Sequence, residues 1–264
     1  MAILLPLLAG LPATSGATVQ APSHERWTQL LAACVITIDD GASTAVDYGC
    51  FDRRHVELQD YLDALSSLSA ADFEALSRAE RLALLINAYN AWTVELILTA
   101  WPELESIRDL GSLLRSPWKK RFIPFLGDTL SLDDIEHGMI RQPGRYDDPR
   151  IHFAVNCASV GCPALREEAF TGVELDQQLE EQTRRFLGDR SRNRVRDDVL
   201  ELSPLFDWYG DDFRRGWRDT RDLEDFLLRY ADALGLSPSQ QQALEIGAME
   251  LRFLDYDWSL NAIR

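Results

Sequence analysis

The longest apolar segment of the chain constrains the fold most. Residues 77–99 are long enough for a helix of about six turns. The middle of this segment reads LALLINAYNAWTVELIL, which is apolar almost all the way round a helix. Such a helix is stable only when other elements cover it on every side. We therefore expect it at the centre of a fold built mainly from helices.

Hydrophobic periodicity predicts further elements around that helix. The expected helices cover residues 25–35, 55–65, 70–76, 131–141, 175–187, 204–214, 222–234 and 237–247. The expected strands lie within residues 46–51, 118–130, 151–157, 194–202 and 249–256. No repeat or interdomain linker interrupts the chain. These features predict an α+β fold, a single mainly helical domain over residues 18–264 with a central buried helix and a small antiparallel sheet.

The N-terminal residues resemble a secretory signal. Residues 2–13 read AILLPLLAGLPA, an apolar run of signal-peptide length that is too short to span a bilayer. Ser15 and Ala17 place small residues before a cleavage site after Ala17. The alternative is a buried helix, but two prolines and a glycine within the run oppose it. We expect residues 1–17 to be a signal peptide and the mature protein to be periplasmic or secreted.

The charge balance excludes some partners. The chain has 43 acidic and 27 basic side chains, and its net charge is −16. This charge repels phosphate backbones and anionic lipids, so we expect no nucleic-acid partner. No later stretch reaches the about 18 apolar residues of a membrane helix, so we expect no membrane insertion of the mature chain. We expect no cofactor.

The segment RIHFAVNCASVGCPALR at residues 150–166 carries the strongest chemical signal. Its first part alternates as a strand does, which places His152 on the face opposite the core residues. A tight loop of small residues then carries two thiols, Cys157 and Cys162. A histidine beside a thiol is what Cys–His nucleophilic catalysis requires.

Position within this segment suggests a role for each group. Cys162 stands just before a proline, where a helix could begin, and free amides at a helix start stabilise a thiolate. We therefore expect Cys162 to be the reactive thiol and His152 its base. Asp257 or Asn156 would orient that base, as the acid of a triad does. If the strand continues as far as Cys157, the alternation of side chains directs Cys157 towards the core, and we expect it to be a structural thiol.

Other interpretations of the two cysteines stay open. Cys157 and Cys162 could form a structural disulfide, or they could be two small buried hydrophobic side chains. A zinc site with His152 and His137 is a further alternative. The C-x4-C spacing is unusual for zinc, so we expect no metal.

Two asparagines lie within the apolar central helix. Asn87 and Asn90 are three residues apart and therefore share one face. A buried amide is costly unless its donor and acceptor are paired. These side chains either tie the helix to neighbouring backbone or line a polar pocket that binds a ligand.

Cys34 and Cys50 flank a Gly/Ser/Thr/Asp loop at residues 39–45. In an exported protein this spacing predicts a disulfide that closes the loop. Such a bond stabilises a fold by roughly 2–4 kcal/mol, because it restrains the unfolded chain.

The motifs INAYN, HFAVNC…GCPAL and DYDWSLN, in this order, resemble the DUF547 family, a domain of unknown function. The resemblance extends over residues 27–261. It implies no established reaction. It implies that the following residues occupy motif positions: Asn87, Asn90, Glu136, His152, Cys157, Cys162 and Pro163. Glu136 thereby joins Asn87, Asn90 and Asn156 as a candidate binding residue.

Three functional hypotheses follow. The first is a thiol-dependent hydrolase or acyltransferase whose fold is similar to papain or transglutaminase, an analogy at the level of fold alone. The second is a non-catalytic protein that binds a small polar ligand or a peptide. The third is thiol–disulfide exchange at Cys157 and Cys162, which the absence of a C-x2-C at a helix start disfavours.

Overall fold

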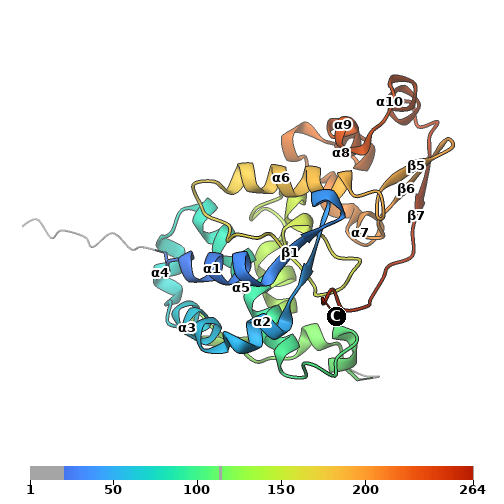
Figure 1. Ribbon diagram of the computed structural model, residues 1–264. Coiled ribbons are helices and arrows are strands. Elements are labelled where there is room, and N and C mark those ends of the chain that lie inside the picture. Colours follow the sequence, from blue (N-terminus) through green and yellow to red (C-terminus); the bar gives the residue numbers. More distant parts are fainter. Residues whose placement is uncertain (1–20, 113–114, 264) are drawn as a thin grey trace, which may run out of the picture.

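A computed structural model describes residues 21–112 and 115–263 of the chain (Figure 1). The expected signal peptide at residues 1–17 lies outside the described residues. The described part is mainly helical and carries three small sheets, which confirms the α+β class. None of its helices is both long and apolar enough to cross a membrane.

Helix α5 (Arg78–Leu98) is the centre of the fold, as its apolar sequence predicts. Ser77 and Glu80 form a reciprocal capping box that pairs two free N–H groups at the helix start. Residues 82–94 are buried without a break. Two helices, α2 (Tyr48–Arg53) and α3 (His55–Ser66), pack on α5 together with the π-helix η4 (Asp134–Ile140).

The remaining helices cover this centre or extend the fold beyond it. The α-helices are α1 (Glu25–Cys34), α4 (Ala70–Ala75), α6 (Leu175–Gly188), α7 (Leu205–Trp208), α8 (Leu223–Arg229), α9 (Ala231–Leu234) and α10 (Pro238–Glu245). Short 3-10 helices are η1 (Asp39–Gly41), η2 (Ile107–Leu110), η3 (Pro117–Lys119), η5 (Pro149–Phe153), η6 (Gly210–Arg214) and η7 (Trp217–Asp219). The expected helices at 204–214 and 222–234 are each divided into two elements.

The strands form three separate small sheets. β1 (Val35–Ile38) and β2 (Ser43–Val46) make an antiparallel hairpin, and so do β3 (Ile123–Phe125) and β4 (Asp128–Leu130). In the third sheet β5 (Arg194–Arg196) pairs antiparallel with β6 (Val199–Leu202). The closing strand β7 (Glu250–Phe253) runs parallel to β6. The chain then returns to the first hairpin, where residue 262 forms a parallel bridge with Val46.

The expected strands at residues 46–51 and 151–157 are wrong. β2 ends at Val46, and Asp47 caps α2 instead by accepting a hydrogen bond from the Cys50 N–H. The second segment begins as the 3-10 helix η5, which Pro149 and the Asp148 cap start. The alternation of apolar and polar residues does not indicate a strand here, because the side chains of η5 are buried on every side.

Burial on both sides of η5 has a structural cause. The buried hydrophobic residues form two clusters, one around α5 and one around α6 to α10. Ile151 belongs to the first cluster, whereas Phe153 belongs to the second and stacks on Phe186 with 4.9 Å between ring centroids. The segment therefore lies between the clusters, and strand parity says nothing about which side chains are exposed.

Cys34 and Cys50 form a disulfide with 5.4 Å between their Cα atoms. The bond joins the end of α1 to α2 across the β1–β2 hairpin. Cys34 is fully buried, whereas Cys50 is partly exposed.

Candidate functional site

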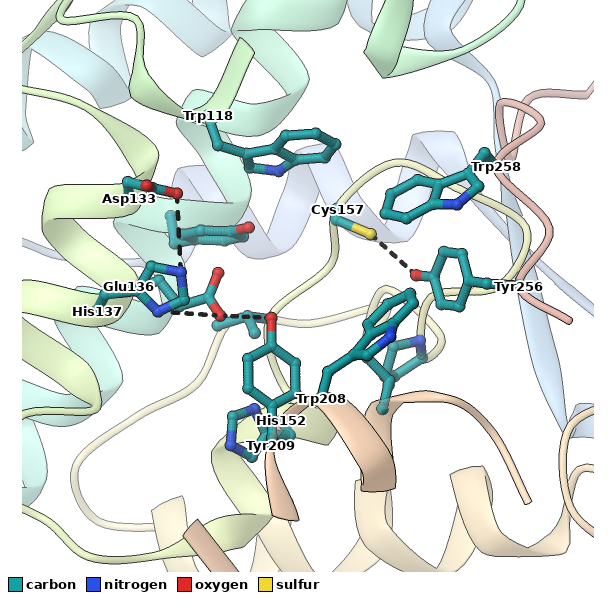
Figure 2. A pocket seen from close by; sticks show the side chains of 14 residues that line it. Trp118, Asp133, Glu136, His137, His152, Cys157, Trp208, Tyr209, Tyr256 and Trp258 are labelled. Carbon is teal, nitrogen blue, oxygen red and sulfur yellow. Dashed lines mark hydrogen bonds and ion pairs between the residues drawn. The ribbon is translucent and has the colours of Figure 1, made fainter. Parts of the chain in front are cut away.

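A pocket of about 220 Å³ opens between α5, η4, α7 and the C-terminal segment (Figure 2). The segment after η5 forms its floor. Carboxylates, aromatic rings and one sulfur line it. The lining residues are Tyr89, Trp118, Asp133, Glu136, His137, His152, Val155, Cys157, Pro163, Leu205, Trp208, Tyr209, Tyr256 and Trp258.

One wall of the pocket is acidic and comes from η4. Where this element begins, the Ser131 N–H donates to the Asp134 carboxylate and the Asp134 N–H donates to the Ser131 hydroxyl. Wide π-turns are frequent at functional sites. Glu136 is 6% exposed, and its Oε1 accepts a hydrogen bond of 3.1 Å from the Tyr209 hydroxyl. Burial and the neighbouring Glu136 carboxylate raise the pKa of Tyr209, so the phenol stays protonated and donates.

His137 sits beside Glu136 at the rim. Arg141 Nη1 donates to His137 Nδ1 at 2.5 Å, and His137 Nε2 lies 3.7 Å from the Asp133 carboxylate. The Arg141 guanidinium packs over the Tyr209 ring with 4.4 Å to the centroid. Arg141 is not among the lining residues, and the described lining contains no lysine or arginine.

The opposite wall is aromatic (Figure 2). The ring centroids of Tyr256 and Trp258 are 4.5 Å apart, and Trp208 lies 4.8 Å from Tyr256. Trp118 meets Trp258 edge-on at 5.8 Å. Arg108 lies over the Trp258 ring at 5.2 Å. Contacts among neighbouring rings hold this wall together.

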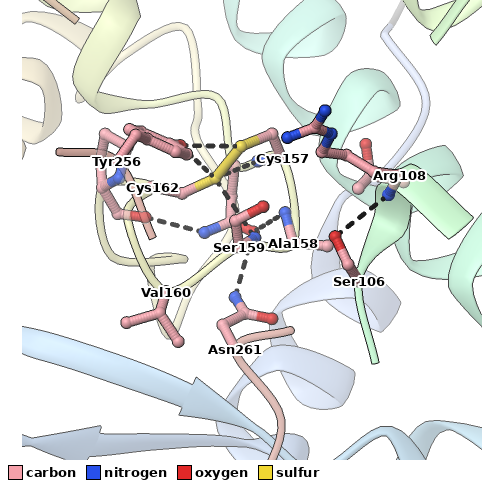
Figure 3. The surroundings of a disulfide bond; sticks show 12 residues. Ser106, Arg108, Cys157, Ala158, Ser159, Val160, Cys162, Tyr256 and Asn261 are labelled. Atoms are coloured by element: carbon pink, nitrogen blue, oxygen red, sulfur yellow. Dashed lines mark hydrogen bonds between the residues drawn. A yellow bond between two sulfur atoms is a disulfide. The ribbon is translucent and has the colours of Figure 1, made fainter. Parts of the chain in front are cut away.

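Cys157 and Cys162 are joined by a disulfide (Figure 3). Cys157 lines the pocket and is partly exposed, whereas Cys162 is 2% exposed. The structure thus places Cys157 on the pocket side and Cys162 in the interior, opposite to the expectation from strand parity. The bond also consumes the two thiolates that a zinc site would need.

His152 is buried beneath Tyr209, and their rings stack with 4.1 Å between centroids. Its Nε2 is hydrogen-bonded to Asp212 Oδ2 at 2.8 Å, and no hydrogen bond to either sulfur exists among the described residues. Burial lowers the pKa of His152, although the bond to Asp212 opposes this shift. The imidazole is therefore neutral and donates to Asp212.

Neither group expected to orient His152 does so. The Asp257 carboxylate accepts from the Ser259 N–H at 2.8 Å. The Asn156 side chain accepts from the Ala158 N–H and donates to the Pro163 carbonyl. Asp257 and Asn156 therefore hold turns of the backbone.

Asn87 and Asn90 tie α5 to neighbouring backbone, which is the structural alternative considered from sequence. Asn87 donates to the Phe170 carbonyl at 2.8 Å and accepts from the Phe170 N–H at 2.9 Å. Asn90 donates to the Ala154 carbonyl at 2.9 Å and accepts from the Asn156 N–H at 2.8 Å. Neither amide lines the pocket, whereas Glu136 does.

Sequence reasoning missed most of the pocket. Nothing in the sequence around Trp208 and Tyr209 distinguishes them from aromatic side chains that pack in the core. Asp133 stands three residues before Glu136, which is a helical spacing that could have drawn attention to one acidic face. Asp212 had no distinguishing signal among 43 acidic side chains.

Comparison of the chain with known proteins gives a match to a family model alone. No curated protein and no solved structure matches the chain, so similarity to papain or transglutaminase stays a prediction. The family model described as "Protein of unknown function, DUF547" matches residues 73–187. This span contains INAYN and the HFAVNC…GCPAL segment, whereas DYDWSLN lies beyond it. The resemblance to the DUF547 family is therefore confirmed over residues 73–187 of this chain.

Proposed function

We propose that the protein binds a small organic cation, an amine or a quaternary ammonium compound, in this pocket. One observation carries the proposal: the carboxylates of Asp133 and Glu136 face a wall of indole and phenol rings. Aromatic faces attract cations through their quadrupoles, and the attraction grows when water is excluded. A carboxylate opposite the rings supplies the countercharge.

Size and charge of the pocket support this choice. A volume of about 220 Å³ suits a molecule smaller than a typical drug-sized ligand. The described lining offers no lysine or arginine to bind an anion. The net charge of −16 raises the concentration of cations near the surface.

Binding has more support than thiol-dependent hydrolysis. A Cys–His enzyme needs a free thiolate within hydrogen-bond reach of its base. Here both sulfurs belong to a disulfide, and the Nε2 of His152 is engaged by Asp212. We place the protein in the periplasm or outside the cell, a location that its two disulfides support because such bonds persist in oxidising compartments.

A panel of amines and quaternary ammonium compounds, with neutral sugars as comparison, tests the proposal. We expect ammonium compounds to raise the melting temperature and sugars to have no effect. Glu136→Gln should weaken binding of the best compound at least about tenfold, because a countercharge at close range is lost. Titration calorimetry measures this change.

Glu245→Gln is the matched control, since it removes the same charge from an exposed position on α10. Its affinity should equal that of the wild type. Unchanged affinity in Glu136→Gln, or preferential binding of sugars, would show that the acidic wall does not bind a cation.

A further inference from the structure

The Cys157–Cys162 bond has two unlike sulfurs. Cys157 is partly exposed and faces the pocket, whereas Cys162 is buried. An attacking thiolate therefore has access to Cys157 Sγ and not to Cys162 Sγ. Access decides which sulfur is attacked in thiol–disulfide exchange, and the other sulfur leaves.

Three donors converge on the sulfur that would leave (Figure 3). Cys162 Sγ accepts from the Cys157 N–H at 3.0 Å and the Ser159 N–H at 3.4 Å. The Tyr256 hydroxyl lies between the two sulfurs, 3.2 Å from Cys162 Sγ and 3.1 Å from Cys157 Sγ, and is in place to donate to a Cys162 thiolate. A disulfide sulfur is a weak acceptor and gains little from three donors. A thiolate gains far more, because hydrogen bonds to a charged acceptor are stronger. Backbone N–H groups that converge on one point in this way form an anion-binding nest.

The backbone of this nest is held in place from several directions. Ala158, between the two donating amides, has a φ of 63°, a left-handed conformation that is unfavourable for alanine. Its N–H donates to Asn156 Oδ1 at 2.9 Å, and its carbonyl accepts from the Asn261 N–H at 3.1 Å. Strained residues of this kind persist where the surroundings fix them, and they cluster at functional sites.

The Tyr256 ring is fitted to the same loop. A Cβ on Gly161 would lie 2.9 Å from the ring, so a side chain at this position would displace the hydroxyl from the sulfur. The Gly161 N–H donates to the Asp257 carbonyl at 2.9 Å. Asn90 anchors the loop from α5 through the Asn156 N–H. All three sequence motifs thus converge on the surroundings of Cys162 Sγ.

We propose that Cys157–Cys162 is a reactive disulfide that exchanges with a dithiol donor, an activity additional to cation binding. A donor thiolate attacks Cys157 Sγ, forming a donor–Cys157 disulfide. The bond between Cys157 and Cys162 breaks, and its electron pair stays on Cys162 Sγ as a thiolate in the nest. The second donor thiol then attacks the donor sulfur of the mixed disulfide and passes its proton to the released Cys157. The donor becomes a disulfide, and the two cysteines gain two electrons.

Selective reduction of the native protein tests the proposal, with the Cys34–Cys50 bond as an internal control. No hydrogen bond to either sulfur of that bond exists among the described residues. The protein is treated with dithiothreitol at graded concentrations. Alkylation and peptide mapping then measure how fast each of the two disulfides is reduced in the same molecule. We expect Cys157–Cys162 to be reduced at least about tenfold faster than Cys34–Cys50. Equal rates, or reduction only in denaturant, would overturn the proposal.

Tyr256→Phe tests the nest, since it keeps the ring and removes the hydroxyl. We expect reduction of Cys157–Cys162 to slow about tenfold, the equivalent of one hydrogen bond to a charged acceptor. Tyr146→Phe is the control, because the buried Tyr146 hydroxyl has no hydrogen-bond partner among the described residues. An unchanged rate in Tyr256→Phe would mean that the hydroxyl does not stabilise the leaving thiolate.

Single-cysteine variants test the direction of attack. The probe is glutathione disulfide, which forms a mixed disulfide with the one cysteine that each variant keeps at this site. We expect Cys157 in the Cys162→Ser variant to react at least about tenfold faster than Cys162 in the Cys157→Ser variant, because only Cys157 faces the pocket. Mass spectrometry measures the product. Faster reaction at Cys162 would contradict the proposed order. These rates are measured without any ammonium compound in solution, so either proposal can fail without the other.

Discussion

Asp212→Ala is expected to lower the free energy of unfolding by about 3–5 kcal/mol, because it leaves the buried His152 and the largely buried side chains of Arg141 and Arg215 without their carboxylate. The Asp212 side chain is 4% exposed. One carboxylate oxygen accepts from His152 Nε2 at 2.8 Å and from Arg141 Nε at 2.7 Å. The other lies 2.7 Å from Arg215 Nη2. Urea denaturation followed by circular dichroism measures the change.

The neighbouring Asp211 provides the control, since its side chain is 95% exposed and pairs with Arg214 at 3.5 Å. Asp211→Ala should change the free energy of unfolding by no more than about 0.5 kcal/mol. A similarly small change in Asp212→Ala would contradict the expectation that the contacts of Asp212 with His152, Arg141 and Arg215 stabilise the fold.

The pH dependence of stability gives a second readout for Asp212. Burial would raise the pKa of Asp212, but hydrogen bonds from His152 and Arg141 outweigh it and hold the pKa well below its usual range. The unfolded state therefore binds the proton more tightly. The resulting stabilisation is present above a pH of about 3.9 and is lost as the pH falls further. Asp212→Asn should remove this part of the acid-side slope.

Asn87→Leu is expected to lower the free energy of unfolding by roughly 2–6 kcal/mol. The substitution leaves the N–H and the carbonyl of Phe170 unpaired in the interior, and each costs about 1–3 kcal/mol. Asn87 itself has no exposed surface. Thermal and urea denaturation measure the loss.

Gln242→Leu is a suitable control, since it makes a similar amide-to-leucine change at an exposed position of α10. Its effect should stay within about 0.5 kcal/mol. An unchanged melting temperature in Asn87→Leu would contradict the account of α5 as a buried helix that asparagines tie to the chain around it.

Local signals in the sequence predicted much of the fold. The all-round apolar character of residues 77–99 placed α5 at the centre. In the structure Ser69 and Ser77 cap α4 and α5, because a side-chain oxygen satisfies a free N–H at a helix start. The β3–β4 hairpin lies within residues 118–130, where the sequence predicts strands. These signals depend mainly on neighbours in the sequence, so they can be recognised without knowledge of the tertiary structure.

The conformation of residues 151–157 could not be predicted from the local sequence. Alternation predicted a strand with a core face and a pocket face. The segment lies between two hydrophobic clusters instead, so both kinds of position are buried. Which cluster Phe153 would join depends on helices more than thirty residues away. Neither periodicity nor spacing carries that information.

The candidate site is composite for the same reason. Glu136 and the two cysteines could be found from motifs, but the rings come from distant positions. Trp118, Trp208 and Trp258 meet only after the C-terminal segment folds back along β2. His152 was identified from sequence, but its partner Asp212 is 60 residues away. A sequence with 43 acidic side chains does not reveal which of them it is.

Tyr256 connects the two proposals. Its ring belongs to the aromatic wall, and its hydroxyl lies 3.1 Å from Cys157 Sγ and 3.2 Å from Cys162 Sγ. A ligand seated against this ring would cover Cys157. The bound cation and an attacking thiolate would thus compete for the same side of the pocket.

The charge of the ligand tests the central claim most directly. Choline and its neutral tert-butyl analogue, in which carbon replaces the ammonium nitrogen, have nearly the same shape and differ in charge. Titration calorimetry on the oxidised wild-type protein compares their affinities. If the pocket recognises an organic cation, choline binds at least about tenfold more tightly than the analogue. Equal affinities, or binding of neither compound, would contradict the claim.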